Sequence, residues 1–528
     1  MAGLRNYVAG LLAGTVLAFG SGMAFAEEKA APAAPAASGT STAITIYSKM
    51  QPGAVPPELY RPSVGGYDWN IGNMIQGYAM VRQERDITLT AERSEVKLDD
   101  ISAFIDPTTV SFKSLTDPEH TTVLEQNYMF DLVNPQKLAE RYLGQKISFE
   151  KRLVQDKAPE MQSGTLVSVQ NGQMTVQKDD GSIVMIPPQD AVFPSLPGKL
   201  FIKPTLVWDV VTKKPGKQRI ETGYQTEGIT WWSDYNAVFE EGADANSGFL
   251  DIGAWVSIVN KSGASYENAK LKLVAGDVQR AQPPMSPRPM MMKAAMVNEM
   301  AADGAGAGFS EKAFFEFHLY TLGRPATIPQ SSTKQIELFP KAVHIPVVKE
   351  MLYDGSQIPY YGGVNYSREF GEQQGNKKVD VFLKFKNDKT HGLGIPLPAG
   401  RLRVSKMDTA DKSLEFIGED VIDHTPKDED IKIKLGEAFD VVGERKQTNF
   451  HVDEARRMVD ESFEIKLRNH KDQPVNVRVK EHLYRADNWQ ISESSQEYAK
   501  DDANTVHYDV SVPKDGEKTV KYTVHYTW

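Results

Sequence analysis

The sequence predicts a mainly β protein, for three reasons. Apolar and polar residues alternate in many short stretches, such as Phe463-Glu464-Ile465-Lys466-Leu467, and this period of two is typical of strands with one buried face. Turn signals such as Asn171-Gly172 separate these stretches, and helical periodicity is scarce. We therefore expect tandem antiparallel β-sandwich domains of the Ig-like kind, with a small inserted SH3-like β-barrel.

The first 26 residues predict an export signal. Arg5 gives a positive start, residues 8–19 form an apolar run, and Ala24-Phe25-Ala26 offers the small-x-small pattern of a cleavage site. The run is too short to span a bilayer, so we expect a signal helix that is removed after Ala26. Residues 27–42, rich in Ala and Pro, follow as a flexible linker or a simple disordered terminus. The periplasm is the expected location.

An N-terminal β domain is expected over residues 43–144, completed by about 199–215. It contains the best helical signal of the chain, near 134–144. There Asn134 is a suitable N-cap, Pro135 suits the first helical position and Gly144 suits the end.

Residues 145–198 are expected to form the small barrel as an insertion. Two hairpin signals, Asn171-Gly172 and Asp179-Asp180-Gly181, join three short alternating stretches in this segment. Strands so short and so closely joined favour a small barrel.

A middle β-sandwich domain is expected over residues 216–348, interrupted by a disordered loop at 283–308 that is rich in Met, Pro and Gly. A C-terminal β-sandwich region follows over 349–528. Its last 25 residues alternate around Pro513-Lys514-Asp515-Gly516, which predicts a hairpin. The final strand ends at Trp528, as outer-membrane barrels often end, although a sandwich strand gives the same pattern.

Composition narrows the classes of function. The chain has no cysteine, which excludes disulfides, thiol nucleophiles and thiolate metal sites. Its net charge of −10 disfavours binding to nucleic acid by charge alone. No stretch after the signal is long and apolar enough for a transmembrane helix.

The methionines of the 283–308 loop form a weak candidate metal site. Thioethers are soft ligands that suit Cu(I), and the alternative is an insertion whose methionines bind no metal. No other cofactor is expected. The candidate ligands are Met285, Met290, Met291, Met292, Met296 and Met300.

Trp231, Trp232 and Tyr235 form a candidate aromatic contact. They lie close together on a predicted strand and could stack on sugar rings, as aromatic residues do in carbohydrate-binding modules. The alternative is that they pack in the core, which is common for aromatic residues on strands.

No catalytic constellation emerges from the sequence. The chain contains no Gly-x-Ser-x-Gly elbow, and its ten histidines have no spacing typical of a metal-binding helix. Carboxylates are plentiful, and two that lie about 5–9 Å apart could hydrolyse a glycosidic bond, but sequence alone does not pair them. Catalytic residues therefore stay unassigned, and we expect a protein that is not an enzyme.

Three regions of the chain carry a resemblance to a known family. They are Phe104–Val110 with Val123–Tyr128, then Gly228–Tyr235 with Trp255–Asn260 and Leu271–Val278, and finally Asn469–Asp472 with Glu481–Leu483 and Trp489. Together they resemble an exported bacterial family known as domain of unknown function 4139. The chain departs from it at Trp232, where the resemblance leads us to expect Arg. The resemblance implies a β-rich envelope protein with no assigned activity.

These observations lead to one expected function and two alternatives. We expect an exported envelope protein that binds or scaffolds without catalysis, with an envelope protein or a glycan as partner and with no nucleic acid. One alternative is an enzyme that acts on envelope polysaccharide. The other is a β protein associated with the outer membrane. The oligomeric state is not predicted.

Overall fold

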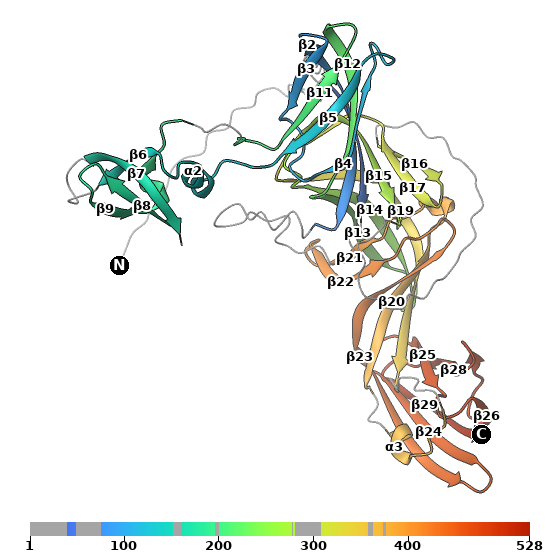
Figure 1. Ribbon diagram of the computed structural model, residues 1–528. Helices are drawn as coiled ribbons and strands as arrows, with labels where there is room; N and C mark the ends of the chain where they lie inside the picture. The colour runs from blue at the N-terminus through green and yellow to red at the C-terminus, as the bar shows by residue number, and fades with distance from the viewer. Residues whose placement is uncertain are drawn as a thin grey trace, which may run out of the picture. The chain divides into compact units, whose positions relative to one another are not determined.

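The computed structural model describes residues 40–48, 75–151, 160–170, 172–195, 200–276, 278–279, 308–356, 363–372 and 376–528. The signal helix, the cleavage position after Ala26 and the six candidate copper-binding methionines lie outside these residues. Over the described residues the protein is mainly β, as predicted (Figure 1).

The N-terminal strands share a sheet with strands from the middle of the chain. The order in this eight-stranded sheet is β16-β17-β15-β1-β2-β12-β4, and β18 also pairs with β15. β1 is parallel to β15, so the two segments are joined by backbone hydrogen bonds. The strands are β1 (Ser41–Ser48), β2 (Gly77–Leu89), β4 (Ile105–Ser114), β12 (Gly216–Thr226), β15 (Tyr266–Ala275), β16 (Phe309–Phe314), β17 (Phe317–Leu322) and β18 (Ala326–Ile328).

A second, three-stranded sheet of order β3-β11-β5 packs into the same hydrophobic core. Trp208 on β11 is completely buried there. Its ring packs edge-on against that of Phe112 on β4, with 5.1 Å between the ring centroids. The strands are β3 (Arg93–Leu98), β5 (Thr122–Met129) and β11 (Thr205–Val211).

The inserted segment forms a sheet with a core of its own, built around Phe149, Leu166 and Val176. Helix α2 (Pro135–Arg141) precedes this segment and adds Ala139 to the same core, and the side chain of Asn134 accepts a hydrogen bond from Lys137 N as predicted for the N-cap. The other elements are β6 (Lys146–Lys151), β7 (Glu160–Gln170), β8 (Gln173–Lys178), β9 (Ile183–Ile186), the 3-10 helix η2 (Pro188–Asp190) and β10 (Ala191–Val192).

The closed barrel predicted for residues 145–198 is wrong. The described strands form an open sheet of order β10-β6-β7-β8-β9. β10 is two residues long, so it offers too few backbone groups to close a ring of strands. The predicted turns are correct: Gly172 and Gly181 lie between paired strands with φ of 72° and 82°, which glycine adopts without strain.

The remaining strands form a 13-stranded sheet whose central path runs β22-β21-β13-β14-β19-β20-β23-β24-β29-β26. β25, β27 and β28 attach to this path through β19. Its strands are β13 (Ile229–Glu241), β14 (Ser247–Asn260), β19 (Ser332–Asp354), β20 (Lys378–Lys386), β21 (Gly400–Met407), β22 (Leu414–Ile422), β23 (Asp430–Asp453), β24 (Met458–Asn469), β25 (Val475–His482), β26 (Asn488–Ser494), β27 (Ala499–Lys500), β28 (Thr505–Val512) and β29 (Gly516–Thr527). The short helices are α3 (Arg368–Glu372) and η3 (Lys389–His391).

The sheets are mixed rather than purely antiparallel, which corrects the prediction. β13 is parallel to β21 and β19 is parallel to β25, in addition to the β1–β15 pair. Each parallel pair joins strands that are far apart in the sequence, so no short turn dictates their direction.

The predicted C-terminal hairpin is also wrong in its pairing. β28 pairs with β25 and β27, whereas β29 pairs with β24 and β26. The apolar faces of the two strands, including Tyr508 and Tyr522, are instead buried in one core. Apolar and polar residues alternate in the same way in two strands that pair side by side and in two strands that face each other across a core. The sequence pattern therefore does not distinguish these two arrangements.

Among the described residues, no helix has the length and apolar composition needed to cross a bilayer.

Candidate ligand-binding face

The candidate site lies on one face of the sheet formed by β22, β21, β13, β14 and β19. Alternation along β13 places Trp231 and Tyr235 in the core, where they are 2% and 0% exposed. The Tyr235 hydroxyl donates to the Pro398 carbonyl oxygen at 2.7 Å, and burial raises the pKa of Tyr235 well above its usual value. Trp232 and Asp234 project from the opposite face.

The predicted aromatic contact is therefore divided by the strand. Trp231 and Tyr235 pack in the core, which favours the core-packing alternative for them. Trp232 is on the outer face but is only 9% exposed. Its indole Nε1 donates to Asp234 Oδ2 at 2.7 Å, so its polar atom already has a partner.

The strand register brings five residues into one line across the sheet. Asp234 on β13 lies opposite Trp255 of β14 and beside Arg401 of β21. Val421 of β22 and Glu337 of β19 complete the line at its two ends. We call this line, Val421–Arg401–Asp234–Trp255–Glu337, the Trp255 row.

Trp255 is the unusual member of the row, because 41% of this large aromatic residue is exposed. The neighbouring position on the same face of β14 is Gly253, where a Cβ atom would meet nothing within 4 Å. Opposite Gly253 lies the exposed amide of Asn236. The indole thus borders open space and lies near an exposed amide, which suits stacking against a flat ligand.

Asp234 is a buried anion at the centre of the row, with 7% exposure. Oδ2 accepts from Trp232 Nε1 and, at 3.0 Å, from Ser257 Oγ. Oδ1 lies 3.4 Å from Arg403 Nη1 and 3.8 Å from Arg401 Nη2. These contacts hold the Asp234 carboxylate in place, because a buried carboxylate needs partners for its oxygens.

The two arginines also have a carboxylate on their other side. Arg403 Nε lies 3.2 Å from Glu419 Oε2, and Arg401 Nη1 lies 4.0 Å from Glu419 Oε1. Both guanidinium groups are partly exposed, at 25% for Arg401 and 35% for Arg403. The orientation of both groups, one strand beyond Asp234 from Trp255, is therefore fixed by ion pairs while part of each surface stays open to a ligand.

A second polar cluster is buried in the C-terminal region. Arg445 is paired with Glu481, which also accepts a hydrogen bond of 2.5 Å from the Tyr522 hydroxyl. Burial disfavours the charged form of Arg445, but Glu481 and Tyr522 raise its pKa above the usual value. Arg485 holds both oxygens of Glu461, at 2.6 and 2.9 Å.

These two arginines also hold a connecting segment, residues 363–372, which we call the strap. Arg485 Nη1 donates to the carbonyl oxygens of Asn365 and Ser367, and Arg445 Nη1 donates to that of Gly371. Both carboxylates are thus occupied by arginine, and the cluster anchors the strap between β19 and β20.

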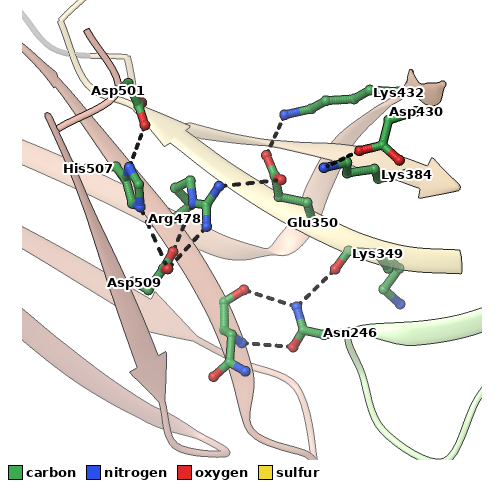
Figure 2. Close-up of polar contacts among 11 residues, drawn as sticks. Asn246, Lys349, Glu350, Lys384, Asp430, Lys432, Arg478, Asp501, His507 and Asp509 are labelled. Carbon is green, nitrogen blue, oxygen red and sulfur yellow. Dashed lines mark hydrogen bonds and ion pairs between the residues drawn. The ribbon is translucent and has the colours of Figure 1, made fainter. Parts of the chain in front are cut away.

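A third cluster surrounds the point where β19 passes from β14 to β25 (Figure 2). Glu350 contacts Lys432 and lies 3.9 Å from Arg478. Arg478 forms a two-point contact with Asp509, at 2.9 and 3.1 Å, which lowers the pKa of Asp509. Asn246 bonds to the backbone of both Lys349 and Asn476, so side chains tie the β13–β14 loop to β25.

No group of three or more His, Asp or Glu residues within the described ranges could hold a metal ion. The candidate Cu(I) site falls on residues that the structure does not describe, so it stays a prediction.

Sequence reasoning did not select Trp255 as a site residue, although a signal was present. From Asp251 to Ser257, every second residue belongs to the more polar face of the strand: Asp251, Gly253, Trp255 and Ser257. A tryptophan among the polar, solvent-facing residues of an alternating strand indicates an exposed aromatic side chain. Arg401 and Arg403 carried no such signal, because only the parallel pairing of β13 with β21 brings them to Asp234.

No curated protein matches the chain in sequence. One family matches, described as a domain of unknown function (DUF4139), and the match spans residues 220–528. It includes the whole Trp255 row and the buried arginine clusters. The N-terminal stretch Phe104–Tyr128, part of the resemblance seen in the sequence, lies outside the match. Since the match covers more than half of the 528 residues, the chain belongs to the DUF4139 family.

Proposed function

We propose that this protein is an exported, non-catalytic binding protein of the cell envelope, and that the Trp255 row is the place where it binds. The proposed ligand class is a saccharide. A sugar ring offers an apolar face for the indole of Trp255 and hydroxyl groups for Arg401, Arg403 and Asn236.

One observation carries the proposal: the 41% exposure of Trp255 next to Asp234, whose carboxylate is held by ion pairs with Arg401 and Arg403. Exposing a tryptophan to water has no benefit for folding, because burial of such a side chain contributes about 1.5–3 kcal/mol. A rigid aromatic beside oriented polar groups is the arrangement of a binding site whose parts need no reordering on binding.

The enzyme alternative has one feature in its favour. Asp234 and Glu337 lie on the two strands that flank Trp255, so their backbones are about 10 Å apart. Two carboxylates beside an aromatic residue are the elements of a glycosidase. Asp234, however, already accepts hydrogen bonds from Trp232, Ser257 and Arg403 and is ion-paired with a second arginine, which suits a positioning role better than proton transfer.

The proposed architecture extends the observed sheets. We propose that the middle and C-terminal regions are Ig-like sandwich domains in tandem, and that the open five-stranded module is a relative of SH3-like barrels. The module supports this by its strand order, in which the last strand returns beside the first after a 3-10 helix.

The test is capture of envelope glycans by the purified full-length mature protein. Solubilised envelope saccharides are passed over immobilised wild-type protein and over the Trp255→Ala variant, and the bound sugars are quantified after hydrolysis. Phe439→Ala is the matched control, because Phe439 is 95% exposed and is not part of the row.

We expect wild type and Phe439→Ala to retain sugar and Trp255→Ala to lose most of it. Equal retention by all three proteins would contradict the proposal, and shortened glycans in the flow-through would favour the enzyme alternative. Cell fractionation tests location: recovery in osmotic-shock fluid supports the periplasm, and recovery in the detergent-extracted outer membrane contradicts it.

A further inference from the structure

The hairpin formed by β16 and β17 ends in an exposed aromatic tip. Phe314 and Phe317 form the last pair of the ladder, and Phe315-Glu316 makes the turn. Phe314 is 57% exposed and Phe315 is 83% exposed. β16 is the edge strand of its sheet, so the tip is not flanked by a further strand on that side in the described part of the chain.

The base of the same hairpin is firmly held. Leu319 and Leu322 are buried in β17, and the Tyr320 hydroxyl donates to the Pro396 carbonyl oxygen at 2.8 Å. His318 Nδ1 lies 2.7 Å from Glu311 Oε1 across the two strands. The apolar surface is therefore confined to the end of a well-anchored projection.

Phe315 also has a strained backbone. Its φ is 57°, the left-handed region, in the first position of a two-residue turn where glycine is the usual residue. Side chains larger than Asn rarely adopt this conformation, and it persists where the surrounding structure or function requires it. The ring of Phe315 lies next to that of its hairpin neighbour Phe317, with 6.0 Å between the ring centroids, and most of it is left to solvent.

We propose that this tip, Phe314 with Phe315, inserts into the apolar layer of a lipid surface. The area is the first argument: two side chains are far too few for a stable protein interface, which needs about 800 Å² from each partner. A bilayer requires no complementary shape, and each inserted aromatic residue contributes independently.

The surroundings of the tip fit the same partner. Lys312 precedes the two aromatic residues and Glu316 follows them in the turn itself, and both are exposed, so their charged groups would extend back to the headgroups while the rings enter the acyl region. The two charges cancel, and the chain as a whole carries a net charge of −10. The tip therefore fits a surface that is zwitterionic rather than strongly anionic.

The experiment is co-sedimentation of the full-length mature protein with vesicles of phosphatidylcholine and phosphatidylethanolamine. The variants are Phe315→Asn alone and Phe314→Ser with Phe315→Asn. Phe439→Ser is the matched control, because it removes a phenylalanine that is 95% exposed and is not at the tip. Thermal unfolding of each protein is recorded in parallel.

Wild type and Phe439→Ser should sediment with vesicles, and Phe315→Asn should lower the partition coefficient about tenfold or more. Phe315→Asn should also unfold at the same or a higher temperature, since Asn tolerates a positive φ. A wild type that does not sediment, or a Phe315→Asn variant that sediments equally, would overturn the proposal. A lower unfolding temperature for Phe315→Asn would show that the phenylalanine serves the fold instead. Because the readout is lipid and not sugar, its failure leaves the saccharide proposal intact.

Discussion

Gly371 is the position where a single methyl group should do the most damage. It belongs to α3 in the strap and has an ordinary helical backbone, so intrinsic helix propensity alone predicts that Gly371→Ala stabilises by about 1 kcal/mol. The packing predicts the opposite. The added Cβ would overlap with Glu461 Oε1 and would lie 2.7 Å from Gln447 Nε2.

The cost follows from how tightly Glu461 is held. This glutamate is 2% exposed, receives two hydrogen bonds from Arg485 and one of 2.6 Å from Gln447. The methyl group must displace the carboxylate or lift the strap, and loss of one charge-assisted hydrogen bond costs about 1.5–3 kcal/mol. After the gain in propensity, we expect a net destabilisation of about 0.5–2 kcal/mol, or about 1–8 °C in the melting temperature.

Differential scanning calorimetry, which resolves the transitions of a large chain, is the suitable assay. Hydrogen exchange should show faster opening of residues 363–372 in the variant. Gly253→Ala is the control, since its Cβ meets nothing within 4 Å and should leave the melting temperature unchanged or higher. A Gly371→Ala protein as stable as wild type would refute the reasoning about the strap.

Three further predictions concern other parts of the chain. Glu481→Ala leaves Arg445 buried without a carboxylate and should lower the free energy of unfolding by about 3–5 kcal/mol in urea titration, whereas Arg445→Met with Glu481→Leu should recover much of the loss. Burial raises the pKa of Tyr128 and Tyr266 from 10.0 to about 12. Below pH 10 both tyrosines are therefore neutral in the folded and in the unfolded chain, and between pH 10 and about 12 they ionise only in the unfolded chain. The urea midpoint should therefore fall with rising pH in that window and be flat below it. Asn134→Ala should cost about 1 kcal/mol, seen as faster amide exchange at Lys137, and unchanged exchange would contradict the capping role.

Local features were predictable from the sequence because their causes are local. The N-cap at Asn134 and the turn glycines Gly172 and Gly181 each depend on residues within a few positions. The alternation that identified the strands also identified the buried faces of β28 and β29 correctly. These features require no knowledge of which strand lies next to which.

Long-range pairing was not predictable from pattern. The turn before β29 suggested a hairpin, but β28 and β29 pair with other strands and contribute their apolar faces to one core, where the rings of Tyr508 and Tyr522 meet. The residues of the candidate site could not be predicted for the same reason. Arg401 reaches Asp234 only through the parallel pairing of strands that are more than 150 residues apart in sequence, and sequence periodicity holds no information on that pairing.

The proposed function depends most on Trp255 as a binding residue, and direct titration tests this role. Isothermal titration of the full-length protein with a panel of soluble oligosaccharides identifies a ligand, and Trp255→Phe and Trp255→Ala are then compared with wild type. Loss of stacking is worth about 1–3 kcal/mol, so affinity should fall about five- to 150-fold in Trp255→Ala and less in Trp255→Phe. Equal affinity of wild type and Trp255→Ala for the ligand would contradict the assignment of the Trp255 row as the binding site.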